Sequence, residues 1–265
     1  MVCGVFERYI PWMIYTEDRD ICEFYFRVPN RPVELRRALE VFAKHDVTIL
    51  SINAYSLPEW DRAPVFVFAD LTGLDVDVES IKDELERVTG EAAHYKRPPV
   101  RGFMMDEFAF PLSVFPGVRS LVLLGLDFEE MIKGLYERLP KVAGTFLYYL
   151  AHSGGKFLAE YLSEKFKLKG RDLLVEVLKF YQAGGWGRVE LVRCRPEEPD
   201  IVLRLYDSIE CKAFKGSNEC ASHFIRGHLS GLLSRILNAD VRVMESKCIA
   251  KGDPYCEFYV EEVSS

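Results

Sequence analysis

The sequence contains no apolar run long enough to cross a lipid bilayer. The longest runs, such as residues 120–126 (SLVLLGL), are far shorter than the roughly 20 residues that a membrane-spanning helix requires. The N-terminal residues, MVCGVFERYIPWMIY, carry charge within their apolar portion and lack a basic segment followed by a small-residue cleavage site. We therefore expect a cytoplasmic protein without a transmembrane helix or a secretory signal.

Basic residues are outnumbered by acidic ones. The chain of 265 residues carries 34 Lys and Arg against 41 Asp and Glu, which gives a formal net charge of −7 and a pI near 5.4. No stretch rich in Lys and Arg supplies the attraction to phosphates on which nucleic-acid binding depends. We therefore expect no direct binding of nucleic acid by this chain.

Familiar catalytic motifs are missing as well. The sequence holds no G-x-S-x-G, no P-loop and no H-E-x-x-H. The glycine-rich residues 184–187 (GGWG) lack the strand-to-helix setting of a dinucleotide loop and are better explained as a turn. An enzymatic role is therefore uncertain, and a non-enzymatic one is favoured.

Cysteine is present, but not in the pattern of a small secreted fold held by disulfides. The number of cysteines is odd, and they are scattered along the chain. We interpret them as free thiols or thiolate metal ligands. They are Cys3, Cys22, Cys194, Cys211, Cys220, Cys248 and Cys256.

Strand and helix patterns alternate in the first third of the chain. The predicted strands, alternating or rich in β-branched and aromatic residues, cover residues 22–28, 47–55, 64–71 and 92–95. The predicted helices cover residues 32–44, which begin with Pro32, and 76–88, which are followed by Gly90. The expected order is βαββαβ, with the second and third strands forming a hairpin.

The segment RVPNRPVELRRALEVFAKHDVTILSINAYS resembles the ACT-domain signature of a strand, a tight loop, an amphipathic helix and a second strand. The resemblance covers roughly residues 20–96. It implies a ferredoxin-like module that binds small molecules, often amino acids, and pairs through its sheet. Val33 stands where the family usually has glycine, so a side chain occupies the place where a ligand would approach the backbone. A structural or dimerising use of the domain is at least as well supported as ligand binding.

Prolines mark a boundary after this segment. Residues 96–102 (KRPPVRG) break the periodicity, because proline continues neither a helix nor a strand. The Phe-rich residues 103–119 favour an irregular connector that docks onto a domain or another subunit. We predict an ACT-like domain over residues 1–96, a linker over 97–118 and a C-terminal domain over 119–265.

The C-terminal domain is expected to begin with a strand from Arg119 and to mix helices with strands. The predicted helices cover residues 128–139, 143–166, 170–182 and 220–237. The predicted strands cover residues 187–193, 200–206, 241–246 and 256–260. Gly227 and Gly231 share one face of the last helix, which permits close approach by a neighbouring element.

A glutamate and two cysteines gather near the C-terminus in the stretch ESKCIAKGDPYC. Glu245 and Cys248 bracket the end of a predicted strand, and the turn at residues 251–254 brings Cys256 back toward them. Three ligands could thus surround one point, and a closed tetrahedral zinc site needs a fourth. The alternative is that the cysteines are small buried core residues. Candidates for the fourth ligand are Cys211, Cys220, His223 and His228.

The run CASHFIRGHLSG at residues 220–231, followed by VMESKCIAKGDPYCEF at residues 243–258, resembles the end of a 4-vinyl reductase domain. The resemblance covers roughly residues 119–262. It implies a mixed α/β fold, similar to that of small vesicle-tethering subunits, that commonly dimerises. Phenol-sensing members hold a structural zinc with three cysteines and one glutamate. Carried over to this sequence, the ligands would be Cys220, Glu245, Cys248 and Cys256, with Cys211 as the substitute for Cys220.

The two resemblances together imply an α+β protein. Its N-terminal domain would be an ACT-like βαββαβ domain of ferredoxin-like fold, and its C-terminal domain a mixed α/β 4-vinyl reductase domain.

Aromatic residues and glycines of the C-terminal domain suggest a ligand pocket. Gly154 and Gly155 could open space beside the long helix, and an apolar cavity with a few polar groups is typical of ligand sites. Members of the resembled family that bind aromatic molecules use an apolar pocket with a histidine and a tryptophan. The alternative is ordinary core packing with one hydrogen-bonded histidine. The candidate lining residues are Tyr148, His152, Phe180, Tyr181 and Trp186.

We therefore expect a homodimeric regulatory protein with structural zinc. It would bind a small hydrophobic or aromatic ligand and act on an unidentified output protein, in transcription or metabolism. An enzyme or enzyme accessory is an alternative suggested by the family name, although fold does not fix function. A third possibility is an assembly adaptor similar to the tethering subunits.

Overall fold

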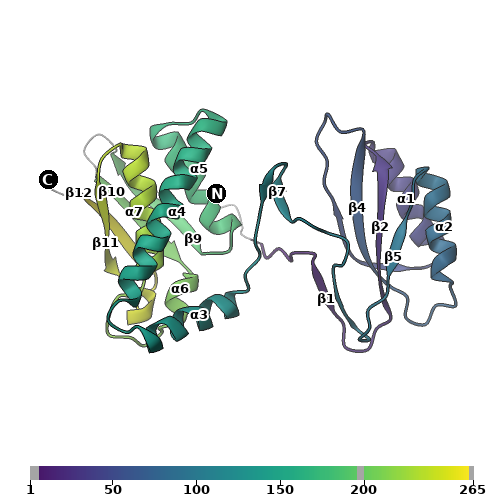
Figure 1. The fold of residues 1–265 in the computed structure, drawn as a ribbon, viewed down its shortest axis with the longest axis horizontal. Helices are drawn as coiled ribbons and strands as arrows, with labels where there is room; N and C mark the ends of the chain where they lie inside the picture. Colours follow the sequence, from purple (N-terminus) through teal and green to yellow (C-terminus); the bar gives the residue numbers. More distant parts are fainter. Residues whose placement is uncertain (1–5, 196–199, 263–265) are drawn as a thin grey trace. The chain divides into compact units, whose positions relative to one another are not determined.

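The chain folds as two units, Met1–Leu121 and Val122–Ser265, in the computed structural model, which describes residues 6–195 and 200–262 (Figure 1). Within these ranges, no helix combines the length and the apolar composition that crossing a bilayer would require.

A four-stranded antiparallel sheet with two helices on one face forms the centre of the N-terminal unit (Figure 1). Along the chain its elements are β2 (Ile21–Pro29), α1 (Pro32–Lys44), β3 (Thr48–Ala54), β4 (Arg62–Asp70), α2 (Val78–Thr89) and β5 (His94–Lys96). The strand order in the sheet is β3-β4-β2-β5. The predicted βαββαβ order and the hairpin of the second and third strands are therefore present.

The alternation of side chains along β2 decides which face of this sheet the helices cover. Cys22, Phe24 and Phe26 are fully buried among residues of α1 and α2. Pro32 lies in the first turn of α1, where a missing N–H costs no hydrogen bond. Gly90 ends α2 with a φ of 72°, a conformation that glycine adopts readily.

The other face of the sheet carries the predicted linker, which belongs to the N-terminal unit. In this segment the strands are β6 (Phe103–Met105), β7 (Ser113–Phe115) and β8 (Val118–Arg119), and β6 pairs with β1 (Met13–Tyr15) near the start of the chain. The Phe108 ring lies 6.0 Å from the Tyr25 ring on β2. The Phe-rich segment therefore packs on the sheet of its own unit.

Glu23 is a buried carboxyl on this second face. It is fully buried, its Oε2 accepts a hydrogen bond from the Glu107 N–H at 3.1 Å, and its Oε1 has no partner among the described residues. Burial, and to a smaller extent the negative charge of Asp106, raise the pKa of Glu23 from 4.5 to about 8.

Replacing Glu23 by glutamine should stabilise the N-terminal unit increasingly as the pH rises. Between pH 4.5 and 8 the unfolded chain loses the Glu23 proton that the folded chain keeps, so the wild type loses stability with rising pH. We expect the advantage of Glu23→Gln to grow by up to about 1.4 kcal/mol per pH unit in this interval. Thermal unfolding at pH 5, 6, 7 and 8 measures it, with exposed Glu107→Gln as control; an advantage that does not change with pH would contradict the assignment.

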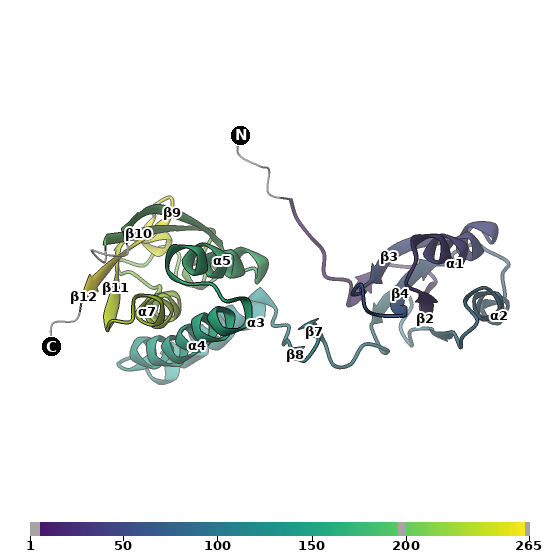
Figure 2. The same cartoon turned by 90° about the horizontal axis from the view of Figure 1, so that it is seen from above.

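The C-terminal unit contains a second antiparallel sheet of four strands, in the order β11-β12-β10-β9. Its strands are β9 (Arg188–Arg195), β10 (Asp200–Tyr206), β11 (Val241–Lys247) and β12 (Cys256–Glu262). Its helices are α3 (Gly125–Arg138), α4 (Ala143–Phe166), α5 (Gly170–Ala183), α6 (Ile209–Lys212) and α7 (His223–Leu237), with a 3-10 turn, η1, at Ile249–Lys251. Figure 2 shows α5 and α7 beside the sheet and α4 packed on α7.

Two elements differ from the sequence prediction. The strand expected from Arg119 ends at that residue, in the two-residue β8, and residues 120–124 form neither helix nor strand. Leu121 is 87% exposed, so the apolar run that suggested a strand finds no neighbouring strand to pair with. The short helix α6 was not predicted, because a four-residue helix has no hydrophobic periodicity to recognise.

The helices α4 and α7 approach so closely that glycine is required at their contact. A Cβ on Gly227 would overlap the backbone carbonyl of Tyr148, and one on Gly231 would overlap that of His152. From the other side, a Cβ on Gly155 would overlap the carbonyl of His228. The close packing predicted for Gly227 and Gly231 is confirmed. The opening considered beside Gly155 is filled by the backbone of α7.

Candidate metal centre and aromatic cluster

Four potential metal ligands come together at one end of the C-terminal sheet. Glu245 lies on β11, Cys248 directly follows that strand, Cys256 begins β12, and Cys211 lies on α6. The turn between the two strands reverses through Gly252, which has a φ of 98°, and the Asp253 carboxylate accepts a hydrogen bond from the Cys248 N–H at 2.8 Å. This turn places Cys256 next to Cys248, as the sequence pattern predicted.

The spacing of the ligand atoms fits a single metal ion. The Cys211 Sγ lies 3.6 Å from the Cys248 Sγ and 3.4 Å from the Cys256 Sγ, and all four ligand atoms lie within 4.8 Å of one another. Two sulfurs in a tetrahedral zinc site with bonds of about 2.3 Å are separated by about 3.8 Å. The three thiols are fully buried and form no disulfide. The cluster could therefore hold a metal ion.

Cys220 lies outside this group of four. It is partly buried, and burial first, followed by the charges of Glu245 and Cys248, raises the pKa of its thiol to about 11. The thiol that completes the compact cluster is that of Cys211. The structure thus brings together Glu245, Cys248 and Cys256 with the substitute candidate rather than with Cys220.

The surroundings of the cluster also fit a bound cation. The Glu245 Oε2 is buried and has no hydrogen-bond partner among the described residues, while its Oε1 accepts a hydrogen bond from the Ser222 hydroxyl at 2.7 Å. Backbone N–H groups of Ala221 and Ile249 point at the sulfurs of Cys248 and Cys256, at 3.5 and 3.4 Å. A buried unpartnered carboxylate oxygen is costly, and a cation would satisfy it.

Proton positions within the cluster lead to the same expectation. Hydrogen bonding with the Cys248 thiol raises the pKa of Cys211 to about 12, whereas hydrogen bonds from the Cys211 and Cys256 thiols lower the pKa of Cys248. Burial raises the pKa of Glu245 to about 8. A divalent cation would replace the protons that these groups otherwise keep.

The segment that supplies Cys211 is tied to the start of α7. Ser208 accepts a hydrogen bond from the Cys211 N–H at 3.5 Å and caps the short α6. The fully buried Glu210 accepts hydrogen bonds from the N–H groups of Phe224 and Ile225 at 2.7 and 2.9 Å. Sequence reasoning missed Glu210 and Ser222; the serine that opens Ser208-Ile-Glu-Cys was the available signal for a helix cap.

Aromatic side chains from α5 and α7 surround a buried histidine in the same unit. The Tyr181 hydroxyl lies 2.7 Å from the His228 Nδ1, and both residues are buried. The Trp186 ring lies 5.0 Å from the His228 ring and 5.4 Å from the Phe180 ring. Burial lowers the pKa of His228 to about 4, so its imidazole is neutral at neutral pH. We refer to Phe180, Tyr181, Trp186, Phe224 and His228 as the aromatic cluster.

The five predicted pocket residues occupy two places. Phe180, Tyr181 and Trp186 belong to the aromatic cluster. Tyr148 and His152 lie on α4, with their rings 6.1 Å apart, and Tyr148 lines a different cleft. The histidine beside Trp186 is His228, which the sequence marks only as a candidate metal ligand.

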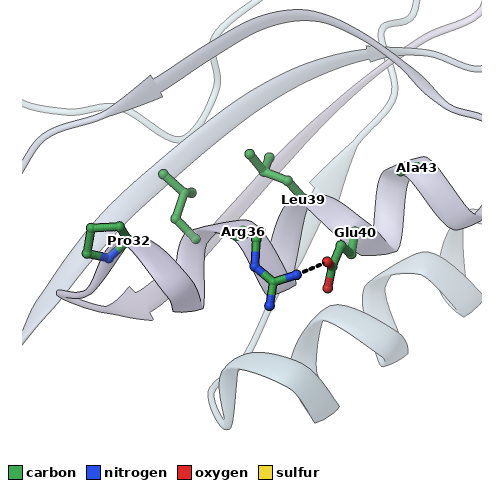
Figure 3. Close-up of a pocket in the computed structure, with 6 residues that line it drawn as sticks. Pro32, Arg36, Leu39, Glu40 and Ala43 are labelled. Carbon is green, nitrogen blue, oxygen red and sulfur yellow. Dashed lines mark hydrogen bonds and ion pairs between the residues drawn. The ribbon is translucent and has the colours of Figure 1, made fainter.

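The N-terminal unit has two depressions of its own. One, of about 400 Å³, follows α1 and is lined mainly by Pro32, Leu35 and Leu39, beside the ion pair of Arg36 and Glu40 (Figure 3). The other, of about 460 Å³, lies on the sheet face opposite the helices. Its aromatic lining residues are Trp12, Tyr25, Tyr55, Trp60, Phe66, Phe108, Phe110 and Phe115.

A mixed α/β unit with a cysteine cluster at its sheet is therefore the defining feature of the C-terminal half. The family model of the 4-vinyl reductase domain matches residues 201–262, which contain all four clustered ligand residues. The resemblance of the C-terminal signature to this domain is confirmed over this range.

Two similar proteins are uncharacterized proteins of Methanocaldococcus jannaschii. MJ1642 is 30% identical over 90 residues, which cover 34% of this chain and 53% of that protein. MJ0150 is 29% identical over 152 residues, which cover 57% of this chain and 75% of that protein. The chain thus spans about half the length of MJ1642.

Two solved structures are similar in fold to part of the chain. The phenol-responsive sensory domain of the transcription activator PoxR, bound to phenol, has a TM-score of 0.49 at 16% identity, covering 54% of this chain and 77% of that one. A vinyl-4-reductase family protein from Methanocaldococcus jannaschii has a TM-score of 0.40 at 23% identity, covering 55% and 85%. Likenesses of this degree leave function to be inferred from the site.

Proposed function

We propose that the protein is a non-enzymatic, ligand-responsive regulatory protein whose C-terminal unit binds a small hydrophobic or aromatic molecule. The observation that carries this proposal is the hydrogen bond between Tyr181 and His228 inside the aromatic cluster. An apolar, aromatic environment with one oriented polar group is typical of sites for small organic ligands.

The neutral His228 would supply the polar contact to the ligand. If the Tyr181 hydroxyl donates to the Nδ1, the imidazole carries its proton on Nε2. The Nε2 forms no hydrogen bond with the described part of the chain and is thus available to a ligand hydroxyl. Gly154 leaves the neighbouring ring edge uncovered, since a Cβ there would lie 3.9 Å from the His228 Cδ2.

The metal in this proposal is a structural zinc ion held by Cys211, Glu245, Cys248 and Cys256. Three thiolates and a carboxylate complete a tetrahedral zinc site and leave no position for a catalytic water. When bound, zinc would connect α6 to the β11–β12 turn and so fix the start of α7, the helix that carries His228.

The N-terminal unit is proposed to be an ACT-like regulatory domain of ferredoxin-like fold. Its βαββαβ order and its strand order support this assignment. Val33, where the ACT pattern has glycine, is 42% exposed and favours a structural or dimerising use over amino-acid binding. We further propose that the protein is a homodimer acting on a separate output protein.

Phenol should raise the melting temperature of the C-terminal unit more than toluene, which lacks the hydroxyl. A ligand that binds only the folded state at 100 times its Kd contributes about 2.7 kcal/mol, and melting temperatures rise by about 2–4 °C per kcal/mol for domains somewhat larger than this one. His228→Leu should remove the preference for phenol. His94→Leu, in the N-terminal unit, is the matched control and should keep it. If neither phenol nor any other small hydrophobic compound shifts the transition, the proposed function is wrong.

A further inference from the structure

A second cleft of about 480 Å³ lies in the C-terminal unit, on the side of α7 where α4 begins. Parts of α3, α4, α7 and β11 contribute to its wall. None of the aromatic cluster residues lines it. The lining residues that matter here are Tyr136, Lys141, Tyr148, Tyr149, Arg226 and Arg242.

Positive charge converges on this cleft. Lys141, Arg226 and Arg242 line it, and none of the three forms an ion pair within the described ranges 6–195 and 200–262. Glu219 is the one acidic residue in its lining. In a chain with a net charge of −7, three cations without acidic partners around one cleft are unexpected unless an anion completes them.

Arg226 is the best fixed of these cations. Its side chain is partly buried, its guanidinium carbon lies 5.9 Å from the centre of the Tyr148 ring, and its Nη2 lies 3.2 Å from the His223 Nδ1. Burial lowers the pKa of His223, so this nitrogen can accept a hydrogen bond from the guanidinium. The buried Glu210 carboxylate is occupied by backbone N–H groups and does not pair with Arg226. The remaining guanidinium donors are free for a ligand.

Tyrosine rings give the cleft an aromatic wall. Tyr148 and Tyr149 lie edge to face with their centres 5.4 Å apart, and Tyr136 lies on the other side with its ring 6.3 Å from that of His223. Planar organic groups pack favourably against such rings. The lining thus combines a surface for a flat apolar body with donors for a negative group.

We propose that this cleft binds a small aromatic anion, either a carboxylate or a phosphate monoester. Its ring would lie against the tyrosines, and Arg226, assisted by Lys141 and Arg242, would hold its charged group. Guanidinium groups suit both anions because they offer paired donors to two oxygens. The site is separate from the aromatic cluster, so the inference does not depend on the ligand proposed there.

Isothermal titration of the full-length protein with phenyl phosphate, benzoate, inorganic phosphate and phenol tests the inference. We expect phenyl phosphate or benzoate to bind at least tenfold more tightly than inorganic phosphate, and the stronger of the two identifies the anionic group. Arg226→Gln should weaken binding of that ligand by about tenfold or more, the loss expected for one charge-assisted hydrogen bond. Arg226→Lys should retain part of the affinity.

Arg235→Gln is the matched control, because Arg235 lies on the same helix but pairs with Glu160 outside the cleft. It should bind like the wild type. Arg242→Gln, on the exposed side of β11, gives a second test should Arg226→Gln disturb folding. The inference is overturned if aromatic anions bind no more tightly than inorganic phosphate, or if their affinity is unchanged in both cleft variants. Phenol binding that survives Arg226→Gln while anion binding is lost would show two separate sites.

Discussion

Cys211→Ser is expected to abolish metal binding, whereas Cys220→Ser should leave it intact. The two cysteines are alternatives in the sequence, but only the Cys211 Sγ lies within a compact cluster with the other ligand atoms. Protein purified without tag or chelator should contain about one zinc ion per chain by elemental mass spectrometry. Cys248→Ser should resemble Cys211→Ser, because both remove a buried ligand.

Loss of the metal should also destabilise the C-terminal unit strongly. Structural zinc contributes about 10–16 kcal/mol of apparent binding energy in small zinc peptides. A net contribution of only about 5 kcal/mol here would correspond to a fall of about 10–20 °C in the melting temperature. Chelation of the wild-type protein should lower the transition of this unit and leave that of the N-terminal unit unchanged.

The cysteine pair decides between two readings of the cluster. Full zinc content in Cys211→Ser together with zinc loss in Cys220→Ser would place the fourth ligand on Cys220. Absence of zinc from the wild type, with no effect of chelator on unfolding, would make the four residues part of an ordinary buried core. Cys220→Ser serves as the matched control for the side effects of removing a thiol.

Gly155→Ala is expected to destabilise the C-terminal unit, and Gly154→Ala to stabilise it slightly. A methyl group on Gly155 would overlap the His228 carbonyl of α7, and two helix backbones must separate to admit it. Overpacking of this kind costs about 1–3 kcal/mol or more. At Gly154 the nearest atom to an added Cβ is 3.9 Å away, so the gain of about 0.5–1 kcal/mol in helix propensity should remain.

Chemical denaturation of the two variants measures the difference directly. The substitutions are identical and adjacent on α4, so propensity effects cancel and the difference reports the contact with α7. Equal effects of both substitutions would mean that α4 and α7 are not packed backbone to backbone. Gly227→Ala provides a check from the opposite helix, because its added methyl would meet the Tyr148 carbonyl.

Local sequence determined most of the secondary structure. The helices predicted over 32–44 and 143–166 have those bounds in the structure, because each has a long amphipathic or apolar pattern with clear ends. The turn between Cys248 and Cys256 was predictable from glycine and proline. Three of the four clustered ligands were therefore within reach of the sequence, since they lie on one hairpin.

The tertiary structure decided how distant segments meet. Cys211 joins the cluster because α6 docks under the hairpin, and a helix of four residues leaves almost no pattern in the sequence. The metal ligands and the ligand pocket themselves stay predictions until they are measured. What the structure adds is which candidates lie together.

The same distinction holds for the aromatic residues. Sequence spacing showed that Tyr148 and His152 share a helical face, and that Phe180, Tyr181 and Trp186 are neighbours along the chain. It did not show that His228 on α7 is the histidine beside Trp186. Periodicity defines the faces of a single helix, whereas the partner of each face depends on packing across the whole unit, here on glycine contacts that set the distance between α4 and α7.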